Sequence, residues 1–321
     1  MRLKTYINST FLILGILLSR NLSAQETSTF FTNLSVRDGL SSNIIACIEQ
    51  DQYDFIWIGT GSGLSRFDGS QFLTFKKEAS PNSLPSNELS TLLADGDYLW
   101  VGTWHGLCRL NLKTFEIQRI DLGGDIAVRA LSKSENSLWV GTNSGLIQYH
   151  LKDQSFTKYS SQENLLSHNT VRTIYEDSLS NLWVGTYDGL NLLPQGESKF
   201  IKIDLPRTDS NGPSNLLILD IKTSNEKLWI GTEVGLFELN QEVNTTKKIE
   251  AEFSNNVIKC IYEDKLGKLW LGTDFGLNIF DPNSNQVATQ FHNPKLSFSI
   301  ANNVIWQIFE DRAGVLWFVT S

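Results

Sequence analysis

A motif that occurs six times constrains the fold of this chain more than any other feature. It reads WIGTGSGL at its first occurrence, from Trp57 to Leu64, and a damaged copy, WFVTS, follows near the end of the sequence. The copies begin 39 to 47 residues apart. Periods of this length indicate propeller blades or stacked repeat units. The tryptophans that open the seven copies are Trp57, Trp100, Trp139, Trp183, Trp229, Trp270 and Trp317.

Each repeat unit contains four short stretches with strand character, separated by turn residues. In the unit from Ser167 to Ile203, these stretches are 171–176, 182–185, 190–193 and 200–203. Four short strands per unit, with an aromatic residue at one fixed place, are typical of a β-propeller blade. We therefore expect an all-β propeller of four-stranded blades, in which the repeated tryptophans fill the spaces between neighbouring blades.

The two ends of the repeat array indicate how the ring closes. Six complete units are followed by a seventh that has only its first two strands, 304–309 and 315–320. The segment 29–43 matches the end of a unit, so we expect a strand at 28–34 that belongs to the closing blade and removes a free edge. Val319 stands where the other copies have glycine. We expect a truncated seven-bladed ring from a longer protein, and a ring that closes imperfectly is the alternative.

The first 24 residues have the composition of a secretory signal peptide. Arg2 and Lys4 give a positive start, an apolar run of eight residues follows at 11–18, and the segment 22–24 ends in small residues. This order is that of a cleaved leader. The apolar run is shorter than the ~20 residues that span a bilayer, so a permanent membrane helix is the weaker alternative. We expect residues 25–321 to form an exported, soluble propeller domain in the periplasm.

Charge and cysteine content exclude several kinds of partner and cross-link. The chain has a net charge of −8, and loss of three basic residues with the leader brings the mature chain to about −11. An acidic chain without basic runs argues against nucleic acid or an anionic membrane as a partner. Three cysteines cannot all pair in a secreted protein. Buried free thiols are therefore expected at Cys47, Cys108 and Cys260.

The two residues between GT and GL vary most among the copies, and they suggest a recognition face. In an up-and-down blade, this loop lies on the same face as the loop that enters the first strand. Variation on a constant scaffold suits binding, whereas ordinary variable loop tips are the alternative. Flat rings beside hydrogen-bonding groups suit a neutral polar ligand such as a sugar. The candidate residues are Trp104, His105, Asn143, Tyr187, Asp188, Glu233, Asp274 and Phe275.

The sequence presents no catalytic, metal or cofactor site. GTGSG at 59–63 resembles a phosphate loop, but the sister copies carry bulky or charged residues in place of Gly61. Glu176 and Asp177 are adjacent, and adjacent residues of a strand point to opposite faces, so we interpret them as strand-end residues. The four histidines show no metal-ligand spacing. An asparagine precedes the first strand of every unit except the third, where Ile126 stands, and it is expected to bond its own backbone.

The unit from Gly39 to Phe75, with its WIGT, GL and FD elements, strongly resembles the two-component regulator propeller repeat. The resemblance extends over nearly all of residues 29–321. It implies the periplasmic sensor region of a hybrid two-component histidine kinase, of the kind found in Bacteroidetes-like bacteria. Such sensors detect oligosaccharides and switch on genes for glycan use. The resemblance also implies an inner-membrane anchor and the rest of the kinase as partners, together with a homodimer.

Two other classes of function remain open at this point. A propeller enzyme that acts on carbohydrates, such as a lyase or a quinoprotein dehydrogenase, would need a convergent acid and base or a metal constellation on one face. The sequence contains neither, so the chain itself is not expected to be an enzyme. An isolated protein-interaction propeller is the second alternative. The family also includes members with other outputs, such as diguanylate cyclases.

Overall fold

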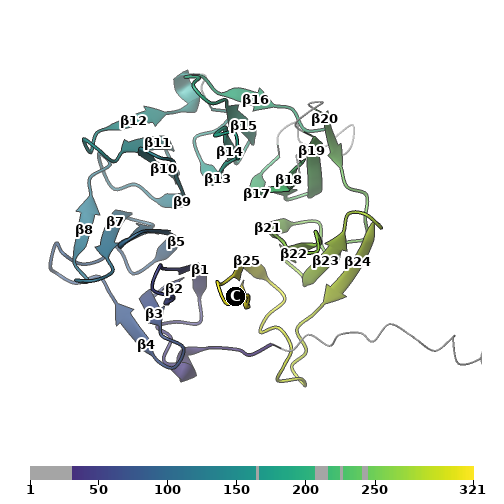
Figure 1. Ribbon diagram of the computed structural model, residues 1–321, viewed down its shortest axis with the longest axis horizontal. Helices are drawn as coiled ribbons and strands as arrows, with labels where there is room; N and C mark the ends of the chain where they lie inside the picture. Colours follow the sequence, from purple (N-terminus) through teal and green to yellow (C-terminus); the bar gives the residue numbers. More distant parts are fainter. Residues whose placement is uncertain (1–30, 164–165, 207–215, 225–226, 241–244) are drawn as a thin grey trace, which may run out of the picture.

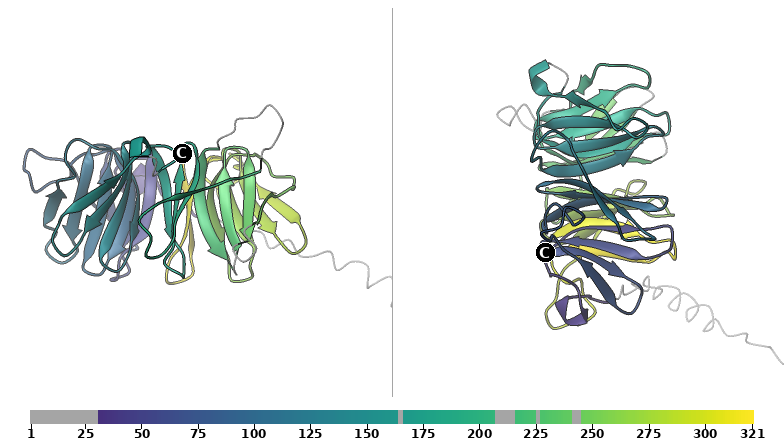
Figure 2. Two further views of the ribbon diagram at one scale, coloured as in Figure 1. Left: turned by 90° about the horizontal axis from the view of Figure 1, so that it is seen from above. Right: turned by 90° about the vertical axis from the view of Figure 1, so that its left-hand side faces the viewer.

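Small antiparallel sheets are arranged in a ring in the computed structural model of the chain (Figure 1). The structure describes residues 31–163, 166–206, 216–224, 227–240 and 245–321, so the expected leader lies outside the described residues. Viewed from the side, the molecule is a flattened ring whose strands run from one face to the other (Figure 2). The fold is a β-propeller, as the repeat predicts.

The described residues form six four-stranded blades and a seventh blade of two strands. Blade 1 contains β1 (Ile45–Gln50), β2 (Ile56–Thr60), β3 (Gly63–Phe67) and β4 (Phe72–Phe75). Blade 2 contains β5 (Leu89–Asp95), β6 (Tyr98–Thr103), β7 (Gly106–Asn111) and β8 (Ile117–Ile120). Blade 3 contains β9 (Val128–Lys133), β10 (Ser137–Thr142), β11 (Gly145–His150) and β12 (Phe156–Tyr159). Blade 4 contains β13 (Val171–Glu176), β14 (Leu182–Thr186), β15 (Gly189–Leu193) and β16 (Ile201–Ile203).

The remaining blades follow the same order along the chain. Blade 5 contains β17 (Ile218–Ser224), β18 (Lys227–Thr232), β19 (Gly235–Asn240) and β20 (Thr245–Lys248). Blade 6 contains β21 (Ile258–Glu263), β22 (Leu269–Thr273), β23 (Leu277–Asp281) and β24 (Gln286–Gln290), and blade 7 contains β25 (Ile305–Glu310) and β26 (Leu316–Thr320). Two 3-10 helices lie in connections, η1 (Val36–Asp38) and η2 (Ser161–Glu163). The first strand of every blade surrounds the centre of the ring (Figure 1).

The repeated tryptophans lie between blades. Trp57 of blade 1 is fully buried in a cluster with Leu89 and Leu99 of blade 2. Trp183 of blade 4 packs in the same way against blade 5, where Ile218 belongs to its cluster. A single blade cannot bury both of its apolar faces, so each tryptophan removes apolar surface of its own blade and of the next from water.

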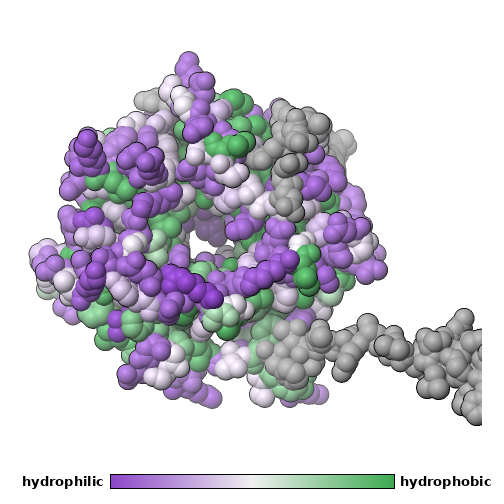
Figure 3. Space-filling view, in the orientation of Figure 1, coloured by the Kyte–Doolittle hydropathy of each residue, from purple (hydrophilic) through white to green (hydrophobic). Residues whose placement is uncertain are grey.

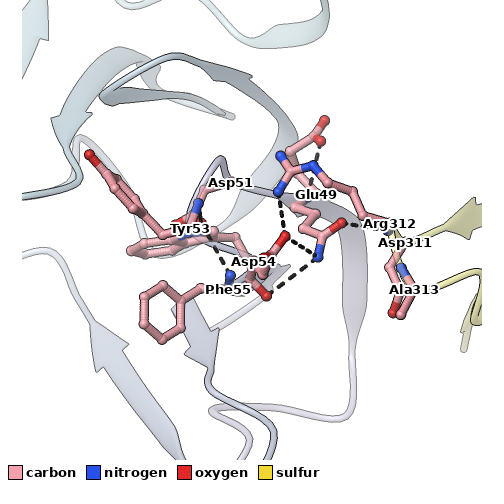
Figure 4. A network of polar contacts seen from close by, with 10 residues as sticks. Glu49, Asp51, Tyr53, Asp54, Phe55, Asp311, Arg312 and Ala313 are labelled. Atoms are coloured by element: carbon pink, nitrogen blue, oxygen red, sulfur yellow. Dashed lines mark hydrogen bonds and ion pairs between the residues drawn. The ribbon is translucent and has the colours of Figure 1, made fainter.

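Blade 7 joins blade 1 mainly through side chains. The Gln307 amide accepts a 3.0 Å hydrogen bond from the Ile48 backbone nitrogen and donates a 3.1 Å bond to the Ile48 carbonyl. The backbone nitrogen of Arg312 donates to the side-chain oxygen of Gln50, and its guanidinium forms a 2.6 Å ion pair with Asp54 (Figure 4). Val319 is buried at this joint against an apolar cluster of blade 1. The two ends of the ring are therefore in direct contact.

The segment ahead of the first blade contacts blade 7 without forming a strand in residues 31–34. The backbone nitrogen of Phe31 bonds to the carbonyl of Phe298 at 2.9 Å, and its ring meets the edge of Phe318. Residues 28–30 of the expected closing strand lie outside the described residues. Among those described, β26 pairs with β25 alone, and a cavity of about 630 Å³ lies beside it.

Candidate functional site

A threonine in each repeat fixes the turn that carries the candidate residues. The Thr103 hydroxyl donates a 2.9 Å hydrogen bond to the Gly106 carbonyl and accepts one from the backbone nitrogen of His105. Gly106 has a φ of 120°, a conformation that costs glycine little. Because the threonine and the glycine hold the turn, the two residues between them are free to vary. The same threonine bonds recur at Thr60, Thr142, Thr186, Thr232 and Thr273.

These turns and the loops that enter the first strands lie on one face of the ring, which we call the loop face. The Trp104 nitrogen donates to the carbonyl of Glu88, and the Tyr187 nitrogen donates to the carbonyl of Thr170, each at 3.1 Å. Both acceptors come directly before a first strand. Both kinds of loop were expected on one face of the ring, and the hydrogen bonds show the same arrangement.

Two of the aromatic candidates meet around one cation. The guanidinium carbon of Arg129 lies 4.7 Å from the ring centre of Trp104 and 5.6 Å from that of Tyr187. Both rings are more than two-fifths exposed. Tyr187 also stacks on His168, with ring centres 6.0 Å apart and planes 14° apart. Blades 2, 3 and 4 thus contribute to one group of side chains, with flat rings open to solvent.

The other candidates do not join this group. His105 faces Asp125 at 3.0 Å, and Asp274 forms a 3.0 Å ion pair with Lys259. Phe275 packs against Phe291, away from the other candidate rings. Asn143 accepts a hydrogen bond from the Ser144 hydroxyl, and Glu233 accepts one from the Leu217 nitrogen in the loop that enters β17. The Asp188 nitrogen bonds to Thr186. The loop face therefore contains one aromatic cluster and several separate polar positions.

The asparagines ahead of the first strands have a structural role in the blades where hydrogen bonds are seen. Asn169 accepts a 2.7 Å bond from the Ser161 backbone nitrogen, and Asn87 accepts one from Lys77. Each asparagine thus holds the connection arriving from the preceding blade. The bond to the local backbone is made by the residue before it, as when Ser86 accepts from the Glu88 nitrogen.

A hollow channel runs through the middle of the ring (Figure 3). It contains a cavity of about 340 Å³ lined by the first strands of all seven blades. Each first strand has a β-bulge near its start, which leaves one residue unpaired and turns it toward the channel. The seven unpaired residues all line the cavity: Ala46, Ser90, Arg129, Arg172, Leu219, Lys259 and Trp306.

The bulge residues were missed in the sequence analysis. Simple alternation places Arg172 on the same side of its strand as Ile174, and a bulge cannot be read from alternation. The available signal was a cation directly after the first apolar residue of the strand, as in Val128-Arg129 and Val171-Arg172. Burial in the channel lowers the pKa of the Arg172 guanidinium. Burial also raises the pKa of the nearby Asp220 carboxyl to about 6.

The paired acids and the cysteines lie in structural positions. Asp177 accepts a hydrogen bond from the Trp183 indole at 2.9 Å, whereas Glu176 accepts one from the Ser134 hydroxyl. The three cysteines are free and buried. Across the described residues, no group of three or more His, Cys, Asp or Glu side chains could hold a metal ion. None of the helices in this part of the chain has the length and apolar character needed to cross a membrane.

Comparison with known proteins agrees with the repeat. A family model described as two component regulator propeller matches residues 39–62, 165–188, 252–275 and 299–321. The chain belongs to the two-component regulator propeller repeat family. Histidine kinase P4 of Formosa agariphila is 30% identical to this propeller over 270 residues, which are 78% of the chain and 20% of that kinase.

Two solved structures resemble this two-component regulator propeller along most of its length. Each is described as the extracellular domain of a hybrid two-component system from B. thetaiotaomicron. The first is 29% identical with a TM-score of 0.81, covering 90% of this chain and 38% of that one. The second is 25% identical with a TM-score of 0.77, covering 91% and 40%. The propeller thus spans a fifth of the kinase and about two-fifths of each extracellular domain.

Proposed function

We propose that this propeller is part of the exported ligand-sensing region of a hybrid two-component sensor histidine kinase and response regulator. It detects oligosaccharides, and the parent protein responds by regulating genes for glycan use through output modules outside this chain. The similarity to extracellular domains of hybrid two-component systems and to a histidine kinase supports the sensor role.

The observation that carries the sugar assignment is the aromatic cluster on the loop face. Trp104 and Tyr187 expose flat rings beside an open channel, on turns whose backbone is held by the repeat itself. Sugars offer C–H faces that cover such rings, while their hydroxyls need polar partners at the edges. Asp188 and His168 are polar residues next to Tyr187 that meet this need.

The position of the propeller in the cell belongs to the same proposal. Residues 1–24 direct export and are removed, and residues 25–321 form the periplasmic propeller. The rest of the kinase is its partner and anchors it in the inner membrane, and two copies pair in the active sensor. The acidic charge of the chain supports the absence of nucleic acid contact by this segment.

A thermal-shift screen of the purified chain against oligosaccharides tests the proposal. A ligand that binds the folded state alone raises the unfolding temperature with concentration. Trp104→Ala and Tyr187→Ala should remove most of that shift for the responding glycan. Phe156→Ala is the matched control, because Phe156 is an exposed ring on the outer strand β12.

Two results would count against the proposal. One is the absence of a shift with any glycan for a chain that unfolds cooperatively. The other is an equal loss of the shift in Phe156→Ala and in the two loop-face variants, because binding would then not involve the aromatic cluster.

A further inference from the structure

Two arginines at the channel form no ion pair within the described part of the chain. Arg129 and Arg172 occupy the same bulge position in neighbouring blades and line the same cavity. Among the described residues, no carboxylate oxygen lies within 4.0 Å of either guanidinium, which is the distance limit for an ion pair. The Nε of Arg129 is buried without a hydrogen-bond partner. The two guanidinium groups thus line the same cavity, and that of Arg129 has a buried donor without a partner.

This arrangement is costly for the folded protein alone. A buried donor without a partner destabilises the folded state, and more so when it is charged. Two like charges on adjacent blades also repel each other. The chain has a net charge of −8, so carboxylates that could pair with an arginine are common elsewhere in the sequence. The loop-face acids Asp125 and Asp188 form no ion pair with either arginine, and Asp125 faces His105 instead.

Lys259 is the third cation among the seven bulge residues, and it differs from the two arginines. Lys259 is paired with Asp274 at 3.0 Å and lies 3.7 Å from the ring centre of Trp306. Its charge is therefore compensated within the protein. Asp220 is the single carboxylate among the residues that line the cavity, and it accepts backbone hydrogen bonds from Ile221 and Ile261. Asp220 interacts with Arg172 through its charge, but the arginines of blades 3 and 4 form no ion pair among the described residues.

We propose that Arg129 and Arg172 bind the carboxylate of an acidic saccharide, while Trp104 and Tyr187 stack on its sugar rings. A guanidinium is a planar fork of donors that matches the two oxygens of a carboxylate. Trp104 and Tyr187 both lie within cation–π distance of the Arg129 guanidinium and hold it in position. The anion screens the repulsion between the two guanidinium groups.

This inference rests on the proposed sensing function and narrows its ligand from oligosaccharides in general to those that carry a uronic acid. The neutral sugar considered from the sequence leaves the two arginines unpaired. An acidic sugar uses both the cations and the rings. A free oxyanion would use the cations alone.

Titration calorimetry with the purified chain tests the proposal. The probes are a glucuronate-containing disaccharide, its neutral glucose counterpart of the same linkage, and sodium sulfate, all at constant ionic strength. The variants are Arg129→Gln and Arg172→Gln. Lys152→Gln is the charge-matched control, because Lys152 is exposed in the turn between β11 and β12. Arg129→Lys keeps the charge and removes the fork, and it serves if Arg129→Gln does not fold.

We expect the acidic disaccharide to bind at least about tenfold more tightly than the neutral one. Each arginine variant should weaken that binding about tenfold or more, as expected for loss of a charge-assisted hydrogen bond, while Lys152→Gln leaves it unchanged. Equal binding of the two disaccharides, or no effect of the arginine variants, would overturn this inference and leave the proposed function standing. Sulfate binding as tight as the acidic disaccharide would overturn the saccharide assignment. The absence of binding by either disaccharide or any other oligosaccharide would overturn both proposals.

Discussion

The indole nitrogen of Trp57 donates a 2.7 Å hydrogen bond to Oδ2 of Asp51, and both side chains are buried. The other oxygen, Oδ1, accepts from the backbone nitrogens of Tyr53 and Phe55. One carboxylate therefore fixes the hairpin between β1 and β2 and the orientation of the tryptophan that fills the space between blades. The same indole bond recurs from Trp183 to Asp177, from Trp270 to Asp264 and from Trp317 to Asp311.

Replacing this carboxylate should destabilise the fold. Asp51→Ala leaves the Trp57 indole and two backbone nitrogens without their acceptor, at a cost of about 3 kcal/mol or more. The free energy of unfolding from urea titration measures the effect. Asp121→Asn is the control and should change stability little, because Asp121 is exposed and the amide keeps the oxygen that accepts from Gly123. Equal effects of the two variants would show that the indole bond is not a major contribution.

The inter-blade tryptophans should carry more stability than the tryptophan of the loop face. Trp183→Ala and Trp229→Ala should each lower the free energy of unfolding by about 3–5 kcal/mol, because each leaves a large cavity between two blades. Trp104 is 43% exposed, so Trp104→Ala should cost less than about 1 kcal/mol. Chemical unfolding followed by circular dichroism separates the two cases. Similar losses for all three variants would contradict the assignment of Trp183 and Trp229 to the core.

The glycine of the WxGT motif should not tolerate a methyl group. A Cβ on Gly102 would lie 2.5 Å from Thr91 and 2.7 Å from Val128 of the next blade. Gly102→Ala should therefore lower stability by about 1–3 kcal/mol through overpacking. Gly61→Ala is the control, because its Cβ would meet Ile44 at an ordinary 3.6 Å. If Gly102→Ala left the free energy of unfolding unchanged, neighbouring blades could move apart without losing stability.

Stability should fall as pH rises through the titration of Asp220. Burial raises the pKa of this carboxyl from 3.8 to about 6, so the folded protein retains a proton that the unfolded chain has released. The folded state is therefore disfavoured progressively between these two pH values. Asp220→Asn should reduce this decline, as measured by the slope of unfolding free energy against pH. Part of the slope should remain, because burial also raises the pKa of Glu49 to about 7.

Asp68 provides a control of opposite sign. Its exposed carboxylate accepts backbone hydrogen bonds from Gln71 and Ser70, which lower its pKa from 3.8 to about 2. Its contribution to stability is present above pH 4 and is lost as pH falls toward 2. Asp68→Asn should thus leave the slope between pH 4 and 6 unchanged. A flat profile for the wild-type protein in that window would contradict the buried titration of Asp220.

The sequence predicted the ring because its period is carried by a few residues with strong packing demands. Trp57 and its copies fix the spacing of blades, and the glycines of the GL step fix the second hairpin. The variable positions Trp104 and Tyr187 could be found because they interrupt a constant motif. These features depend on local chemistry and on repetition, both of which a single sequence displays.

The remaining parts of the site depend on contacts that no repeat reveals. Arg129 reaches the channel because a bulge turns it inward, and it meets rings from the blades on either side of its own. Asp177 was interpreted as a strand-end residue, and its bond to Trp183 depends on the return of the chain in the hairpin. Separation in sequence does not show which of many exposed side chains will face one another.

The replacement of glycine by Val319 makes the joint between blades 7 and 1 unlike the others. At other joints, a bare glycine backbone receives the next blade directly, whereas here a valine side chain and the Gln307 amide stand between the two strands. The six other joints depend on the absence of a side chain at the glycine, whereas this joint depends on the fit of one. A smaller residue at Val319 would therefore loosen the contact between blades 7 and 1, while a larger residue at any of the six glycines would push two blades apart.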